Sequence, residues 1–227
     1  MLIIKRHGIL IFWVVLFIHC AMIYTGKPQY AQYTKILLMP ILIVFLALNA
    51  RKKLYPTSKL IIFTGLIASF AGDLCLIFDD RNFFLTGMIC FAITHICYAS
   101  IFIRMAKVKF TRATEFIIAS VVVSVLSVKL LQFLTPYLGE MRIPVKMYMA
   151  IIAIMAATAS NLLGNKLLKV LASSFFVPAA ALFVLSDTVL AANYFLYKEP
   201  FLGVVVMMSY GYAQCLMVQG FTRYLRA

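Results

Sequence analysis

Eight stretches of about twenty mostly apolar residues follow one another along the 227-residue chain. They fall at residues 8–25, 33–50, 58–78, 83–104, 114–134, 143–163, 170–195 and 201–223. A membrane-spanning helix needs about 20 such residues, whereas a lone strand cannot cross lipid because its backbone groups would lack partners. The ten-residue alternation of a membrane β-barrel does not occur in these stretches. The sequence therefore predicts an all-α polytopic membrane protein with eight transmembrane helices.

The composition agrees with this prediction. Hydrophobic residues make up 64% of the chain and charged residues 12%, whereas a soluble domain has about 25% charged residues. No linker divides the chain, so we expect one integral membrane domain over residues 1–227, in contact with membrane lipid. The net charge of +14 does not indicate nucleic-acid binding, because the basic residues form short clusters between apolar runs.

The basic residues also predict an orientation in the membrane. Alternate connections carry fourteen of them on one side and four on the other. The larger set is Lys5, Arg6, Arg51, Lys52, Lys53, Lys59, Arg104, Lys107, Lys109, Arg112, Lys166, Lys169, Arg223 and Arg226, and the smaller is Lys27, Arg81, Arg142 and Lys198. Because positive connections stay inside, both termini should be cytoplasmic. The compact chain favours a bacterial inner (plasma) membrane, with the endoplasmic reticulum as the alternative.

Two of the seven acidic residues, Asp73 and Asp187, lie well inside apolar runs. A charged aspartate at a helix centre costs about 3 kcal/mol on insertion scales, so its presence indicates a function. With a rise of about 1.5 Å per residue, both carboxylates fall in the outer half of the membrane, and Asp187 is the deeper of the two. We therefore predict a cleft that opens to the non-cytoplasmic side and holds both carboxylates.

Other polar side chains fall at a similar depth. Tyr148 lies in the sixth run, Tyr210 and Gln214 share a face of the eighth, and Lys35 is expected in the first turn of the second helix. His95 lies nearer the middle of the membrane. For each of these residues, a purely structural hydrogen bond or ion pair between helices is the alternative to a role in the cleft.

Metal and nucleotide chemistry are not indicated. The chain has only three histidines, His7, His19 and His95, and they lack the HxxxH spacing of zinc hydrolases. The five cysteines form no CxxC pair and lie within apolar runs, as buried thiols do. We therefore expect no metal and no cofactor.

Six short motifs occur in order from the second helix to the eighth. They are Thr34-Lys35-x-x-x-Met39-Pro40, Gly72-Asp73-x-x-Leu76, Phe84-x-x-Gly87 with His95-x-x-Tyr98, Pro144-Val145-x-x-Tyr148, Ser186-Asp187-x-x-Leu190-Ala191 and Tyr210-x-x-x-Gln214. Together they resemble the lysoplasmalogenase (YhhN-like) family of membrane proteins. The resemblance implies a hydrolase that cleaves the vinyl ether bond of lysoplasmalogens, which are 1-alkenyl lysophospholipids, and releases a fatty aldehyde and a glycerophospho-base.

By matching positions, the resemblance implies that Asp73 and Asp187 are catalytic. The substrate-binding residues that we predict are Lys35, His95, Tyr148, Ser186, Tyr210 and Gln214. We expect Asp187 to act as general acid, Asp73 to stabilise the resulting cation and direct water, and Lys35 to bind the phosphate. Lys146 and Arg142 are expected to assist Lys35. The alternative from another functional class is a small proton- or cation-coupled transporter that uses the same two aspartates.

Overall fold

The computed structural model describes residues 2–50, 55–78, 80–106 and 114–226, and in this part of the chain it contains helices and no strands. The α-helices are α1 (Leu2–Tyr24), α2 (Pro28–Asn49), α3 (Pro56–Cys75), α4 (Arg81–Ala106), α5 (Thr114–Leu138), α6 (Arg142–Asn161), α7 (Lys169–Leu171), α8 (Val177–Ala192) and α9 (Pro200–Arg226). Short helical turns join them: η2 (Gly139–Met141), η3 (Leu162–Gly164), η4 (Ala172–Phe176) and η5 (Asn193–Tyr197). The predicted all-α fold is confirmed.

Seven segments of the described chain are long and apolar enough to cross a membrane. They are Ile3–Tyr24, Gln29–Asn49, Pro56–Cys75, Arg81–Ala106, Val128–Gly164, Lys169–Tyr197 and Pro200–Arg226. The fifth of these joins the end of α5 to α6, and several side chains of the predicted run 114–134 lie outside the described residues. The basic residues Arg51 to Lys53, Lys107, Lys109 and Arg112 also lie outside them. The chain is a multi-pass integral membrane protein.

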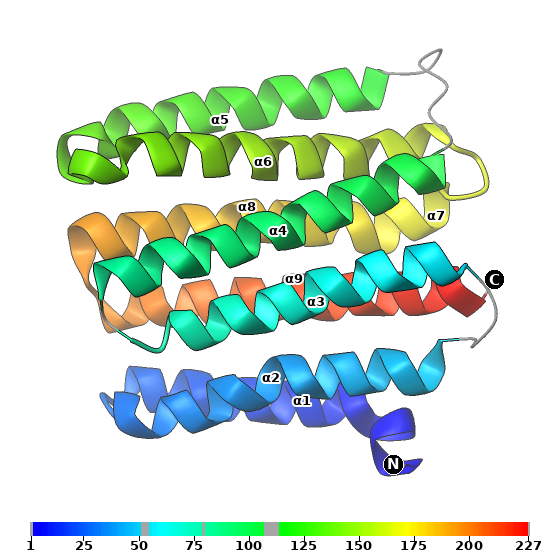
Figure 1. Ribbon diagram of the computed structural model, residues 1–227, viewed down its shortest axis with the longest axis horizontal. Coiled ribbons are helices and arrows are strands. Elements are labelled where there is room, and N and C mark those ends of the chain that lie inside the picture. Colours follow the sequence, from blue (N-terminus) through cyan, green and yellow to red (C-terminus); the bar gives the residue numbers. More distant parts are fainter. Residues whose placement is uncertain (1, 51–54, 79, 107–113, 227) are drawn as a thin grey trace.

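The long helices form a bundle with α1 and α2 along one side and α5 and α6 along the opposite side (Figure 1). α1 begins and α9 ends at the same end of the bundle. α9 runs through the core, where Ala213, Met217 and Phe221 are fully buried. α3 and α8, which carry the two aspartates, both bond to α9, since Tyr210 donates to Asp73 and Ser186 donates to the Val206 carbonyl.

The contact between α3 and α4 is close because small residues of α3 face α4. A Cβ atom added at Gly72 would lie 2.9 Å from a ring carbon of Phe91, so that ring would have to shift. About two helical turns away, the hydroxyl of Thr94 donates to the carbonyl of Gly65 over 3.0 Å. Asp73, the neighbour of Gly72, is buried in this region and accepts a hydrogen bond from Tyr210 of α9.

Proline fixes the start of α2 and corrects one expectation. Pro28 occupies the first turn, where its missing N–H would have no helical partner in any case. The helix therefore begins before the apolar run at residue 33, because Gln29 and Tyr30 continue the helix without being apolar. The prediction that Lys35 lies in the first turn is wrong, because it lies about two turns into α2.

The predicted seventh helix is one continuous rod made of α7, η4, α8 and η5. Both η4 and η5 are π-helical turns, which widen a helix and often occur at functional sites. The turn η5 follows the helix of Asp187 and ends at Lys198, which has a left-handed backbone with φ of 56°. It brings Asn193 and Tyr194 to the edge of the central cavity described below.

Candidate active site

A cavity of about 380 Å³ lies between α1, α2, α3, α4, α8 and α9. Both Asp73 and Asp187 line it, together with Lys35. It leads to a wider hollow of about 700 Å³, and both are lined by Ile23, Asn193, Tyr194 and Gly203. Gly26 and Lys198 edge this hollow, so the cavity opens at the end of the bundle opposite the start of α1. Its size is typical of pockets that bind small molecules.

Asp73 ends a chain of buried hydrogen bonds. The Tyr210 hydroxyl donates to Asp73 Oδ2 over 2.7 Å and lies 2.8 Å from the Ser69 hydroxyl. Gln214 Nε2 donates to Ser69 over 2.7 Å, and Tyr98 donates to Gln214 Oε1 over 2.9 Å. Because a tyrosine hydroxyl has one proton, Ser69 must donate to Tyr210. Each bridging proton in this series of hydrogen bonds, from Tyr98 to Tyr210, therefore points towards Asp73.

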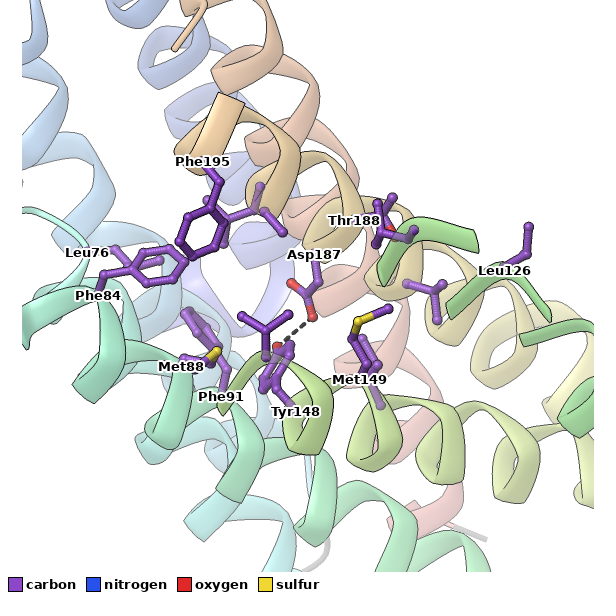
Figure 2. A pocket seen from close by; sticks show the side chains of 16 residues that line it. Leu76, Phe84, Met88, Phe91, Leu126, Tyr148, Met149, Asp187, Thr188 and Phe195 are labelled. Atoms are coloured by element: carbon purple, nitrogen blue, oxygen red, sulfur yellow. Dashed lines mark hydrogen bonds between the residues drawn. The ribbon is translucent and has the colours of Figure 1, made fainter. Parts of the chain in front are cut away.

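Asp187 belongs to a smaller network of hydrogen bonds. The Tyr148 hydroxyl donates to Asp187 Oδ2 over 2.6 Å, as Figure 2 shows. His95 Nε2 lies 3.1 Å from the Tyr148 oxygen and 3.3 Å from Asp187 Oδ2. Since both neighbours of His95 Nε2 accept, that nitrogen carries a proton and Nδ1, which is buried, has no partner among the described residues. The Asp187 side chain keeps 15% of its surface exposed.

Asp187 also faces a small apolar pocket of about 60 Å³ between α4, α5, α6 and α8. Phe84 and Phe195 lie on one side of the carboxylate and Met149 on the other (Figure 2). The pocket shares Leu126 and Val184 with an apolar groove of about 420 Å³ between α5, α6 and α8. Of the two aspartates, only Asp187 lines both the polar cavity and the apolar pocket.

The predicted site residues take three kinds of position. Lys35, Ser186 and Tyr210 line the cavity, although the Ser186 hydroxyl donates to the Val206 carbonyl over 3.2 Å. Tyr148 lines the apolar pocket. His95 and Gln214 are buried behind the tyrosines, with 1% and 0% of their surface exposed. The expectation that Lys146 and Arg142 assist Lys35 is wrong, because both are exposed on α6 and line neither space.

Lys35 is the cation of this cavity. Its side chain lines the same cavity as His19 of α1 and Asp73 of α3. Within the described residues, no carboxylate lies within ion-pair distance of its amine. The lysine is therefore available to an anionic group that enters the cavity.

His19 entered the predictions from sequence only as a possible metal ligand. The side chain is 2% exposed, lines the cavity, and places Nδ1 2.9 Å from the Ala31 carbonyl oxygen. A histidine within an apolar run is a functional candidate on the same grounds as an aspartate, so the signal was available.

A family model described as the YhhN family matches residues 30–221 of the chain. The chain belongs to this family. His19 lies ahead of the matched region, whereas the two aspartates and their tyrosines lie within it.

Curated relatives agree with the family match. The chain is 32% identical to the lysoplasmalogenase TMEM86A of Bos taurus over 163 residues, which cover 69% of this chain and 62% of the relative. It is also 32% identical to the Homo sapiens lysoplasmalogenase TMEM86A over 162 residues, with the same shares. The chain thus spans about three fifths of the length of these relatives. No solved structure matches it significantly.

Proposed function

We propose that this protein is a membrane hydrolase that cleaves the vinyl ether bond of lysoplasmalogens. The observation that carries the proposal is the pair of carboxylates on one cavity. Each accepts a hydrogen bond from a tyrosine hydroxyl, and Lys35 lines the same cavity. The names of the curated relatives support the substrate class. The transporter alternative has no such support from the comparisons.

The reaction requires an acid and an anion. Water does not attack an unactivated vinyl ether, so hydrolysis begins when a proton is added to the carbon remote from the oxygen. The electrons of the double bond form the new C–H bond, and the positive charge is shared by the other carbon and the ether oxygen. Glycosidases stabilise a similar cation with one carboxyl that is protonated and a second that is ionised. Asp73 and Asp187 can divide these roles between them.

The position of the apolar pocket supports Asp187 as the acid. The carbon that receives the proton belongs to the hydrocarbon chain, and the pocket beside Asp187 is the apolar space next to the carboxylates. Asp73 lines only the cavity on the side of Lys35, where the glycerol and phosphate would lie. Tyr148 occupies Oδ2 of Asp187, which leaves Oδ1 to deliver the proton.

The second half of the reaction restores both groups. Asp73 accepts a proton from water as the water oxygen bonds to the cationic carbon, and a hemiacetal results. The hemiacetal hydroxyl then returns a proton to Asp187 while the carbon–oxygen bond to glycerol breaks. The glycerol oxygen takes the proton held by Asp73, and the aldehyde leaves. One water is consumed, and Asp187 is again protonated.

The test is hydrolysis in D₂O by the purified protein. We expect a lysoplasmalogen to yield a fatty aldehyde with one deuterium on the carbon next to the carbonyl, under conditions in which the free aldehyde does not exchange. Aldehyde without that deuterium would refute protonation of carbon. Cation or proton flux into liposomes without any aldehyde would favour a transporter.

We also propose that the chain forms one domain with eight spans, cytoplasmic termini and a cavity that opens to the non-cytoplasmic side of an inner (plasma) membrane. The excess of basic residues on one set of connections supports this orientation. Reporter fusions after Lys53 and after Lys198 should then give signals from opposite sides. Signals from the same side would refute it.

A further inference from the structure

The mechanism above does not use His19, although this side chain is buried in the wall of the cavity. Its ring reaches from α1 to α2, where Nδ1 lies 2.9 Å from the Ala31 carbonyl oxygen and 2.9 Å from the Thr34 hydroxyl oxygen. The other ring nitrogen, Nε2, is buried and has no hydrogen-bond partner among the described residues. One side of the ring thus makes a contact between helices, while the other side has none.

The two contacts of Nδ1 settle which nitrogen carries the proton. A carbonyl oxygen can only accept, so Nδ1 donates to Ala31. The Thr34 hydroxyl donates its own proton to the same carbonyl over 2.8 Å, so its oxygen can accept a hydrogen bond from Nδ1 as well. In the neutral ring, Nε2 then presents a lone pair. A buried acceptor without a partner costs free energy, which a ligand that brings a donor would recover.

The surroundings of His19 indicate which donor this is. His19 lines the same cavity as Lys35 and Asp73, so the histidine shares that cavity with the place proposed for the phosphate and with one of the carboxylates. In a lysoplasmalogen, the glycerol carbon between the vinyl ether and the phosphate carries a free sn-2 hydroxyl. With the phosphate at Lys35 and the vinyl ether between the carboxylates, this hydroxyl falls on the wall that His19 shares with Lys35.

We propose that His19 Nε2 accepts a hydrogen bond from the sn-2 hydroxyl and so selects lysolipids over lipids that carry an acyl chain at sn-2. The inference rests on the proposed function for its substrate class. An sn-2 ester has no proton to donate, so it would leave Nε2 unpaired as well as adding bulk. A site built around a substrate hydroxyl discriminates strongly against the analogue that lacks it.

The test measures binding, with lipids that cannot react. The probes are a saturated 1-O-alkyl-glycero-3-phosphocholine with a free sn-2 hydroxyl and its sn-2-deoxy counterpart. Choline has no N–H group, so the hydroxyl is the only donor in the lipid. For the wild-type protein in detergent, we expect the hydroxyl probe to bind at least about tenfold tighter.

Three variants separate the ligand contact from the contact between helices. His19→Asn keeps an N–H that can reach Ala31 but removes Nε2, so both probes should bind equally, at the affinity of the deoxy probe. His19→Gln places an amide oxygen near the Nε2 position and should restore part of the preference. Thr34→Val removes the hydroxyl contacts with Nδ1 and with the Ala31 carbonyl but leaves Nε2 in place, so it should keep the wild-type ratio.

Equal binding of the two probes by the wild-type protein would overturn the proposal, and so would a preference that survives in His19→Asn. If His19→Asn fails to fold, the wild-type ratio can still overturn the proposal, and the partial preference expected of His19→Gln then tests the residue. Because the probes lack a vinyl ether, their binding is independent of turnover. Wild-type protein that keeps the ratio but releases no aldehyde would refute the proposed reaction alone, and aldehyde release without the ratio would refute the role of His19 alone.

Discussion

The two aspartates have the same type of hydrogen-bond partner but very different surroundings. Each accepts a short hydrogen bond from a tyrosine, Tyr210 for Asp73 and Tyr148 for Asp187. Asp73 is 2% exposed and has a chain of buried polar groups behind it, whereas the Asp187 side chain is 15% exposed and has a single histidine. A carboxylate in a rigid and buried network suits a fixed electrostatic task, and one that borders two spaces suits proton delivery to a substrate.

The largest expected effect comes from removing either carboxylate. Asp73→Asn and Asp187→Asn should each lower kcat for a lysoplasmalogen by about 10²–10⁴-fold, because an amide can neither deliver the proton nor stabilise the cation. The measurement is aldehyde release by protein of matched thermal stability. Asp80→Asn makes the same chemical change at an exposed residue before α4 and should leave kcat as it is. Full activity in either buried variant would remove that carboxylate from the mechanism.

Lys35→Ala, which changes the cavity wall near Asp73, should have a smaller effect on the kinetic constants. A phosphate contact is made in the ground state and the transition state alike, so its loss should raise KM by about tenfold or more and change kcat little. Lys129→Ala, on an exposed position of α5, is the matched control and should alter neither constant. A fall in kcat at constant KM would show instead that Lys35 acts through the neighbouring Asp73.

Part of this site can be predicted from the sequence, and the rest depends on packing. Apolar runs reveal the helices, because lipid penalises backbone groups that lack hydrogen-bond partners. An aspartate within such a run reveals a functional position, because lipid also penalises a charged side chain. The partner of each aspartate is set by how the helices pack, and that information is not local. Tyr148 and Tyr210 fall at similar predicted depths, so depth alone does not assign one to Asp73 and the other to Asp187.

Lys35 shows the second limit of sequence reasoning. Its depth was measured from the first apolar residue of the second run, but polar residues after Pro28 extend the helix by more than a turn. The error moved the lysine from the buried cavity to the membrane surface. It also suggested Lys146 and Arg142 as partners, which are exposed on another helix.

The two tyrosines should also differ in how much each one stabilises the fold. Tyr210→Phe takes the acceptor from Ser69, which is fully buried, and the donor from Asp73. It should lower the free energy of unfolding by about 2–3 kcal/mol. Tyr148→Phe leaves Asp187 partly exposed and 3.3 Å from His95 Nε2, so the loss should be about 1 kcal/mol. Unfolding in detergent measures both, and equal losses would show that the two networks are equally rigid.

The smallest expected effect is that of chelation. Among the described residues, no three His, Cys, Asp or Glu side chains are grouped as metal ligands would be. His19 and His95 each commit one nitrogen to a partner in the protein, His19 to Ala31 and His95 to the Asp187 group. Incubation with EDTA should therefore leave aldehyde release unchanged, with a zinc hydrolase treated in parallel as a positive control. Loss of activity that one divalent cation restores would mean that Asp73 and Asp187 act as metal ligands, and the division of labour between them would then have to be replaced by metal-activated water.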